Sequence, residues 1–291
     1  MKVCFIINPV SGHRRSRDGR GERLDRITRQ MGVEAGLWMT ERRGHAGELS
    51  RRAVMEGYDR VVSVGGDGTM NEVAAGLVGT GVPLGLIPLG SGNGLARDLG
   101  LPLAFDRAVV VALQGRVRVI DSGSVNGKPF FNIMGMGFDA ELGRRFNSSS
   151  RRGFLTYLRL GTTAFFGYAM QTCRVEAESA GRQHFQAFLL SVANSTQFGN
   201  GARVAPRARL DDGRLDLVAV TTAHPVLGLG LAARLFAGTF DRSRHTVTLV
   251  GERFRIVREK PGPVHTDGEI HEMGAELLVE VHPGSLRVVV S

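Results

Sequence analysis

The sequence predicts a two-part protein, an α/β half with a parallel sheet followed by a half made mainly of antiparallel strands. In the first half, short apolar runs alternate with helical patterns. From about residue 117 apolar runs follow one another closely, and Asn126-Gly127 between two of them is a strong hairpin signal. The length of 291 residues also exceeds that of a usual single domain. We therefore expect domains over residues 1–122 and 123–291.

The first half is expected to alternate strands with helices. Strands are predicted at residues 2–7, 33–39, 58–64 and 83–87, and helices at 21–31, 44–56, 70–77 and 91–99. Pro9 and Gly12 end the first strand, and the side chains of Asn8 and Ser11 add polar groups there. Because ligands bind at the carboxyl edge of such sheets, this end is a candidate site.

The second half is expected to be rich in strands, with two helices. Strands are predicted at residues 117–123, 124–125, 129–134, 173–177, 184–193, 214–221, 246–250, 253–257 and 275–290, and helices at 154–170 and 226–240. The apolar side chains of the 154–170 helix suit either a lipid-facing surface or core packing.

Composition and charge narrow the class of protein. A hydrophobic content of 42% with 22% charged residues is typical of a soluble globular protein. Two cysteines without metal-binding spacing suit a reducing compartment. The N-terminus lacks a signal-peptide pattern, and no apolar run is long enough to span a membrane, so we expect a cytoplasmic protein.

The net charge of +9 favours anionic partners, namely nucleotides, nucleic acid or a membrane surface. Arginines cluster at residues 13–17, 42–43, 144–145 and 151–152, and an ordinary solvated surface explains these clusters equally well. Aromatic residues do not alternate with the basic ones, and no nucleic-acid-reading motif is present, so a nucleic-acid partner is not expected.

The most informative stretch is Gly65-Gly66-Asp67-Gly68-Thr69, which joins an apolar strand to a helix. Glycines let a ligand approach the backbone, and helix N-terminal amides favour anions, so the stretch predicts a phosphate site. It is not a Walker A motif. Asp67 would repel a phosphate unless it holds Mg²⁺ or accepts a proton. The alternative is a tight turn in which Asp67 caps the next helix.

Three motifs together carry a family resemblance: Asn8-Pro9-x-Ser11-Gly12, Gly65-Gly66-Asp67-Gly68-Thr69-x-Asn71-Glu72, and Pro88-x-Gly90-Ser91-Gly92-Asn93-x-Leu95-Ala96-Arg97. They resemble the diacylglycerol kinase/sphingosine kinase catalytic family, and more closely its soluble bacterial lipid kinases. Further matches follow in the family order at residues 137–140, 206–216 and 267–269. The resemblance implies an ATP-binding α/β domain and a β-sandwich lipid domain, with the nucleotide in the cleft between them.

The resemblance also implies ATP and Mg²⁺ as cofactors, and it assigns roles to individual residues. Asp67, Asp267 and Glu269 would be catalytic, and which of them accepts the proton stays open. Asp139 would contact the substrate. Glu141, two residues later, could contact a polar head group, but its sequence position favours capping the next helix. The residues expected at the nucleotide are Asn8, Pro9, Ser11, Gly12, Thr40, Gly65, Gly66, Asp67, Gly68, Thr69, Asn71, Glu72 and Ser91.

A second metal site is implied at Asp212, completed by backbone carbonyls around Arg209 and Arg214. Such ligands suit Mg²⁺ or Ca²⁺, but a plain β-turn explains the same residues nearly as well. One departure concerns Gly94, which follows Asn93 where many bacterial diacylglycerol kinases have aspartate. The turn looks more like the sphingosine kinase branch, so the acceptor could be diacylglycerol, a sphingoid base, ceramide or another lipid alcohol.

The expected partner is a membrane lipid, reached by peripheral contact at the inner face of the membrane, and a homodimer is left open. Two other functions stay open. The related NAD kinases also use a Gly-Gly-Asp-Gly turn, and a non-catalytic lipid- or nucleotide-binding regulator is conceivable. His13, His45, His265 and His271 show no ligand spacing and are interpreted as surface or turn residues.

Overall fold

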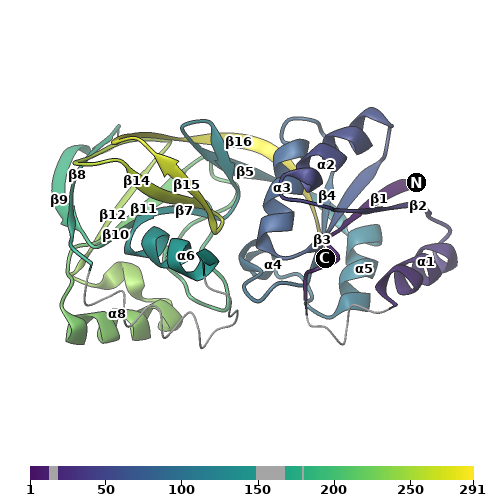
Figure 1. The fold of residues 1–291 in the computed structure, drawn as a ribbon, viewed down its shortest axis with the longest axis horizontal. Helices are drawn as coiled ribbons and strands as arrows, with labels where there is room; N and C mark the ends of the chain where they lie inside the picture. The colour runs from purple at the N-terminus through teal and green to yellow at the C-terminus, as the bar shows by residue number, and fades with distance from the viewer. Residues whose placement is uncertain (13–18, 149–167, 179) are drawn as a thin grey trace. The chain divides into compact units, whose positions relative to one another are not determined.

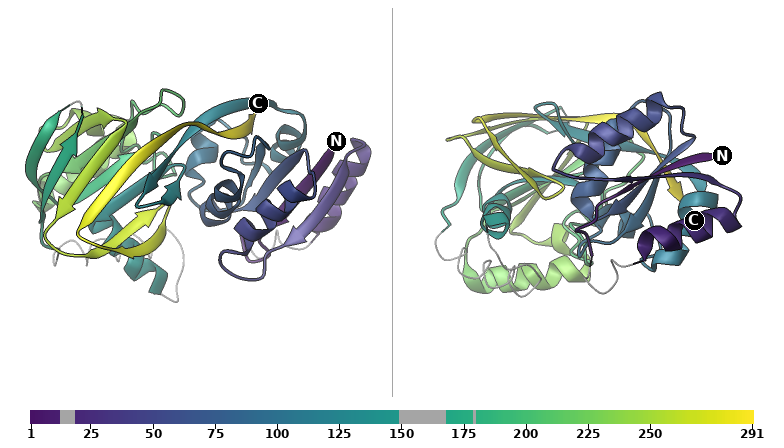
Figure 2. Two further views of the ribbon diagram at one scale, coloured as in Figure 1. Left: turned by 90° about the horizontal axis from the view of Figure 1, so that it is seen from above. Right: turned by 45° about the vertical axis from the view of Figure 1, so that its right-hand side comes forward.

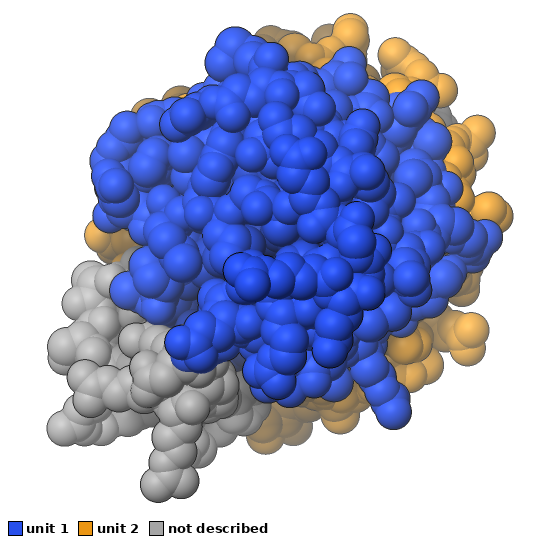
Figure 3. Space-filling view, turned by 90° about the vertical axis from the view of Figure 1, so that its right-hand side faces the viewer, with its two compact units in different colours: residues 1–120, 284–291 blue, residues 121–283 orange. Residues whose placement is uncertain are grey.

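The computed structural model describes residues 1–12, 19–148, 168–178 and 180–291 (Figures 1 and 2). The chain forms two compact units, coloured separately in Figure 3. Unit 1 comprises residues 1–120 and 284–291, and unit 2 comprises residues 121–283. The domains expected from the sequence, 1–122 and 123–291, instead place residues 284–291 in the second domain. Residues 284–291 belong to unit 1 because the end of the last strand pairs in parallel with β4, where Val288 lies opposite Leu84.

Unit 1 is the expected α/β fold. Its strands lie in the order β2-β1-β3-β4, all parallel, with the end of β16 beyond β4. Its elements are β1 (Lys2–Ile7), α1 (Arg20–Gln30), β2 (Glu34–Met39), α2 (His45–Met55), β3 (Arg60–Gly65), α3 (Asp67–Leu77), β4 (Leu84–Pro88), α4 (Gly94–Asp98) and α5 (Phe105–Gln114).

The sheet of unit 1 is buried, which explains its apolar strand sequences. Phe5 and Val62 pack with Leu24 of α1 and Val109 of α5 in one core cluster. Helices α2 and α3 lie on the other side of the sheet (Figure 1). The sequence pattern does not predict α5, although Ala108, Val109, Ala112 and Leu113 form its buried face.

Unit 2 contains the expected antiparallel β-sandwich. One sheet has the order β12-β11-β10-β7-β14-β15, and the other contains β9, β8, β13 and the first part of β16. Its elements are β6 (Lys128–Phe130), β7 (Ile133–Gly137), α6 (Phe138–Ser148), β8 (Gln171–Ala177), β9 (Gly181–Ala187), β10 (Leu189–Ala193), β11 (Leu215–Val220), α8 (Pro225–Ala237), the 3₁₀ helix η2 (Phe240–Arg242), β12 (Thr246–Gly251), β13 (Arg253–Arg258), β14 (Gly262–Thr266) and β15 (Glu269–Met273). Strands β5 (Arg116–Val125) and β16 (Glu276–Val290) contribute residues to both units.

The sandwich core lies between the two sheets of unit 2. Leu190 and Leu217 from the first sheet join Phe254 and Val279 from the second in one buried cluster. The predicted hairpin is confirmed: β5 pairs antiparallel with β6, and Asn126 and Gly127 at the turn have φ values of 46° and 78°.

Several predicted boundaries are wrong for identifiable reasons. The single strand expected at 184–193 is two strands, because β9 pairs with β8 whereas β10 pairs with β7 and β11 of the other sheet. The hairpin β14–β15 was not expected. The 226–240 helix ends at Ala237, where Gly238 adopts a left-handed conformation with φ 66°.

The helix expected at 154–170 lies outside the described residues except for 168–170, which are not helical. The arginine clusters at 13–17 and 151–152 are outside the described residues as well. Among the helices in the described part of the chain, none is long and apolar enough to cross a membrane.

Candidate functional site

The two glycine-rich turns meet at the carboxyl ends of β3 and β4. Gly65 lies opposite Pro88 in the sheet, and the Leu89 N–H donates to the Gly65 carbonyl at 2.7 Å. A Cβ atom on Gly90 would lie 2.8 Å from the Cα of Gly66, closer than a side chain permits. The turns can approach this closely only because both residues are glycines.

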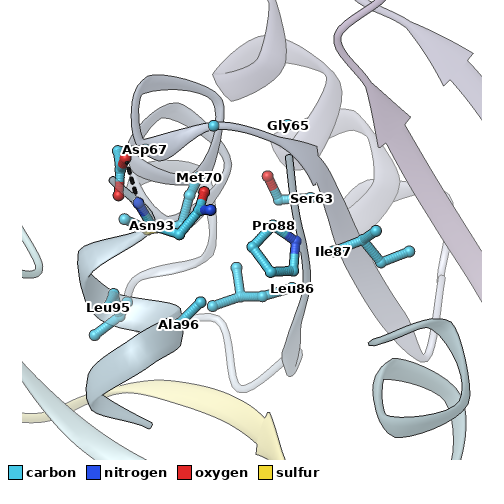
Figure 4. A pocket seen from close by; sticks show the side chains of 11 residues that line it. Ser63, Gly65, Asp67, Met70, Leu86, Ile87, Pro88, Asn93, Leu95 and Ala96 are labelled. Carbon is cyan, nitrogen blue, oxygen red and sulfur yellow. Dashed lines mark hydrogen bonds between the residues drawn. The ribbon is translucent and has the colours of Figure 1, made fainter. Parts of the chain in front are cut away.

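Asp67 links the two turns. Its Oδ2 accepts the Asn93 N–H at 2.9 Å, drawn in Figure 4, and its Oδ1 accepts the Gly94 N–H at 2.8 Å. Burial raises the pKa of the Asp67 carboxyl, and these two hydrogen bonds act in the opposite direction. Asp67 is also the first residue of α3, which therefore begins earlier than the Met70 predicted from the sequence. The carboxylate thus stands at the N-terminal ends of α3 and α4.

Asn93 holds the second turn in shape. It adopts a left-handed conformation with φ 50°. Its Oδ1 accepts the Gly90 N–H at 2.9 Å, and its Nδ2 donates to the Gly90 carbonyl at 2.7 Å. Ser91 at the tip is exposed. The turn therefore presents a hydroxyl group on a fixed backbone.

A small pocket lies beneath the turns (Figure 4). Its only side-chain oxygens apart from that of Asn93 come from Asp67 and Ser63, and the buried Ser63 hydroxyl has no hydrogen-bond partner among the described residues. The lining consists of Ser63, Gly65, Gly66, Asp67, Met70, Leu86, Ile87, Pro88, Asn93, Leu95 and Ala96.

The motif after β1 joins the same edge of the sheet. The Asn8 N–H donates to the Val64 carbonyl at 3.0 Å, and its Nδ2 donates to the Thr69 Oγ1 at 3.0 Å. The Thr40 N–H donates to the Ile7 carbonyl at 2.9 Å, which brings the end of β2 beside the end of β1. The structure thus brings Asn8, Thr40 and Thr69 to the edge at which the glycine turns lie.

The end of that motif, Ser11-Gly12, contacts Arg20, a residue that the sequence analysis did not single out. Its Nη1 donates to the Ser11 carbonyl at 2.9 Å. Gly12 has φ 80°, and a Cβ atom there would lie 2.6 Å from Arg20 Nη2. A buried arginine beside a glycine with positive φ gave no recognisable signal in the sequence.

Glu72, expected near the nucleotide, makes structural contacts in unit 1. Its Oε1 accepts the Gly44 N–H at 2.8 Å and its Oε2 accepts the Ala46 N–H at 3.1 Å. A negative carboxylate at this position stabilises the N-terminus of α2, whose N-cap Gly44 offers no side-chain cap.

Replacing Glu72 with alanine is therefore expected to lower the free energy of unfolding by about 1–2 kcal/mol, since two backbone N–H groups lose their acceptor. Urea denaturation would measure this loss. Glu48→Ala, on the exposed side of the same helix, is the matched control and should cost less. Wild-type stability in Glu72→Ala would contradict the capping role.

The two carboxylates near residue 268 differ sharply. Asp267 lies at the tip of the β14–β15 hairpin, and its carboxylate accepts three backbone N–H groups, from Phe131 at 2.8 Å and from Asn132 and Ile133 at 2.9 Å each. Glu269 begins β15 and is partly exposed. Among the described residues its carboxylate has no hydrogen-bond or ion-pair partner. Asp267 is thus a structural anchor, whereas Glu269 is available to a ligand.

Asp139 and Glu141, the expected substrate residues, lie in the first turn of α6. Asp139 accepts the Ala140 N–H at 2.8 Å, and its Oδ2 also lies 3.2 Å from His265 Nε2 and 3.3 Å from Ser191 Oγ. Glu141 pairs with Arg144 at 2.8 Å. The interpretation of His265 as a surface or turn residue is wrong, because it is 7% exposed and lies in β14.

Asp212 lies in a tight turn. Its Oδ1 accepts the Arg214 N–H at 3.1 Å, and Gly213 between them has φ 70°. Burial, with the charges of Asp212 and Asp241, raises the pKa of the nearby Asp216 to about 6. In the described part of the chain no three His, Cys, Asp or Glu side chains gather as metal ligands. The β-turn interpretation accounts for these contacts, and a metal at Asp212 with the Arg209 and Arg214 carbonyls stays a prediction.

Two family models match the chain. Residues 2–125 match the diacylglycerol kinase catalytic domain, and residues 132–290 match the YegS C-terminal NAD kinase beta sandwich-like domain. A Pseudomonas aeruginosa PAO1 protein named "Probable lipid kinase YegS-like" is 33% identical over 89% of this chain and 86% of its own length. A Bacillus subtilis protein named "Diacylglycerol kinase" is 29% identical over 92% of this chain and 89% of its own.

Solved structures share the fold. A diacylglycerol kinase from Bacillus anthracis gives a TM-score of 0.75 at 19% identity, covering 100% of this chain and 97% of its own. An NAD kinase from Archaeoglobus fulgidus in complex with ATP gives a TM-score of 0.57 at 14% identity, covering 99% of this chain and 93% of its own. At such identities the likeness establishes the fold alone.

Proposed function

The chain belongs to the family that joins a diacylglycerol kinase catalytic domain to a YegS C-terminal domain, and we propose that it transfers a phosphoryl group from ATP to the hydroxyl group of a membrane lipid. The observation that carries the proposal is the pair of glycine turns held together by Asp67. The lipid kinase names of the relatives support a lipid as the acceptor.

The glycine turns fit the phosphates of ATP. Helix α3 begins with no side-chain cap, so its first backbone N–H groups lack intrahelical acceptors and favour an anion. A Cβ atom on Gly68 would meet nothing within 4 Å, so the backbone there is open to a ligand. The hydroxyl groups of Thr40 and Ser91 and the side chain of Asn8 are the polar groups proposed to contact the rest of the nucleotide.

Asp67 fits a role at Mg²⁺. Each carboxylate oxygen accepts a backbone N–H group of the second turn, and the carboxylate has further lone pairs that can bind an oxygen-preferring cation. Bound Mg²⁺ would neutralise charge on the transferred phosphoryl group. Asp67 itself is held in place by α4, so its position does not depend on the cation.

Glu269 is the proposed proton acceptor. Three backbone N–H groups already occupy the carboxylate of Asp267, whereas the carboxylate of Glu269 is available to accept a proton from a lipid hydroxyl group. Asp139, with Glu141 nearby, is proposed to contact the lipid head group. Access to the lipid would require peripheral contact with a membrane.

The test is incubation of the protein with labelled ATP, Mg²⁺ and a total lipid extract, followed by identification of the labelled product. NAD, offered in a parallel reaction, is the competing acceptor suggested by the fold shared with NAD kinases. A labelled lipid that Asp67→Asn fails to produce is the expected result. Preferential phosphorylation of NAD would reverse the assignment, and labelling of neither acceptor would favour a non-catalytic regulator.

A further inference from the structure

Helix α8 in unit 2 has an apolar surface on both of its sides. Leu231, 7% exposed, packs on the outer face of the six-stranded sheet, in a cluster with Val218 and Val220 of β11. Leu235 packs against the same cluster. These contacts settle which side of α8 is its core side.

The opposite side of α8 carries large apolar side chains in solvent. Val226 is 69% exposed, Leu229 75% and Phe236 58%. Their spacing places them on one stripe of the helix, together with the exposed small residues Gly230, Ala233 and Ala237. A surface helix normally has polar residues on this side. A contiguous apolar stripe instead marks an interaction surface.

The edge of this stripe is basic. Arg234, exposed, is the single charged residue of α8. Arg203 lies at the end of the helix, where its N–H donates to the Leu235 carbonyl at 2.9 Å, and the exposed Arg242 follows in η2. Residues 221–240 contain no acidic side chain, and the carboxylate of Asp241, next in the chain, is 8% exposed and paired with Arg207 at 2.9 Å.

We propose that α8 docks on an anionic lipid bilayer, with Val226, Leu229 and Phe236 at the boundary between head groups and acyl chains and with Arg234 and Arg242 against the lipid phosphates. An apolar stripe beside cations is the pattern of helices that lie in the plane of a membrane interface. A second copy of the chain is a poorer occupant, because two-fold packing of this stripe would bring like-charged arginines together.

The docking surface goes beyond the proposed kinase function, since it lies on α8 and needs no nucleotide. It also lies elsewhere than residues 154–170, for which the sequence left a lipid-facing surface and core packing open.

The first test is cosedimentation of the full chain with vesicles of phosphatidylglycerol and phosphatidylcholine, without ATP. The double variant Leu229→Glu/Phe236→Glu is expected to partition at least about tenfold more weakly than the wild type, because two apolar side chains no longer enter the interface. Met55→Glu is the matched control, since Met55 is 80% exposed at the end of helix α2 in unit 1. It should bind as the wild type does.

The second test distinguishes an effect of the arginines beside the α8 stripe from an effect of the net charge of the whole protein. Arg234→Glu/Arg242→Glu is expected to weaken binding to the anionic vesicles several-fold, since each basic residue near such a surface contributes to binding. Arg26→Glu/Arg43→Glu changes the net charge equally at exposed positions in unit 1 and should have a smaller effect. Circular dichroism of each variant verifies its fold.

The proposal would be overturned if Leu229→Glu/Phe236→Glu bound vesicles as the wild type does, or if each control variant lost as much vesicle binding as the α8 variant with which it is matched. It would also be overturned if the wild type bound no vesicles and instead formed a dimer that Leu229→Glu/Phe236→Glu dissociates. Phosphorylation of a water-soluble short-chain lipid separates docking from chemistry. If Leu229→Glu/Phe236→Glu phosphorylates the soluble lipid but no longer binds vesicles, the docking role is supported. If the wild type does not phosphorylate the soluble lipid, the result bears on the kinase proposal alone.

Discussion

Replacing Asp67 with asparagine is expected to lower the turnover of lipid phosphorylation at least about a thousandfold. The substitution removes the negative charge proposed to hold Mg²⁺ beside the phosphates but keeps the size of the side chain. The remaining amide oxygen can accept only part of what the carboxylate accepted from Asn93 and Gly94. Turnover at saturating ATP and lipid measures the effect.

The fold of this variant is expected to survive. The amide NH₂ group would face one backbone N–H, which costs about 1–3 kcal/mol. Burial raises the pKa of Asp67 because a charged carboxylate is costly to bury, and the neutral amide avoids that cost. Because the pKa of Asp67 is higher in the folded than in the unfolded protein, Asp67 adds stability at a pH below its ordinary, unfolded-state pKa. This added stability is lost as the pH rises through the raised pKa of the folded protein. The asparagine variant should therefore lose less stability, relative to the wild type, at pH 8 than at pH 4.

Asp25→Asn on helix α1 is a suitable control, because Asp25 pairs with Arg29 one turn away on the same helix and lies outside the glycine turns. It should turn over as the wild type does. Wild-type-like turnover in Asp67→Asn would remove Asp67 from the mechanism and with it the proposed use of the glycine turns.

The sequence was informative where local pattern decides structure. The apolar runs of β1 and β3 predicted a buried parallel sheet. Asn126-Gly127 predicted the β5–β6 hairpin, because both residues tolerate positive φ. The return of β16 to unit 1 was not predictable, because it depends on pairing with β4 some two hundred residues earlier.

The roles of polar side chains were the hardest to predict. Whether a carboxylate binds a ligand or a backbone N–H group depends on which N–H groups the tertiary structure leaves without acceptors. Glu72 caps a helix that precedes it in the chain, and His265 is buried beside Asp139 from a distant segment. The family motif marked Glu72 and Asp139 as important but could not separate binding from structural support.

Asp267 and Glu269 provide the second large effect, because substitutions at these two positions, separated only by Gly268, are expected to give opposite results. Glu269→Gln should reduce turnover about a hundredfold or more, the usual contribution of a general base, and leave stability unchanged. Asp267→Ala should lower the free energy of unfolding by about 3 kcal/mol, since three backbone N–H groups lose their acceptor together.

Two measurements on each variant distinguish these roles: urea denaturation, and turnover of the folded fraction at a temperature where both variants are native. Glu272→Gln on the same strand β15 is the control, because it removes the same charge as Glu269→Gln at a nearby position. A stable but inactive Asp267 variant, beside an active Glu269→Gln, would move the proton acceptor to Asp267. That result would require Asp267 to release its hold on residues 131–133 during the reaction, because its oxygens accept those N–H groups in the folded chain. The expected result requires no such rearrangement, and for that reason we favour Glu269.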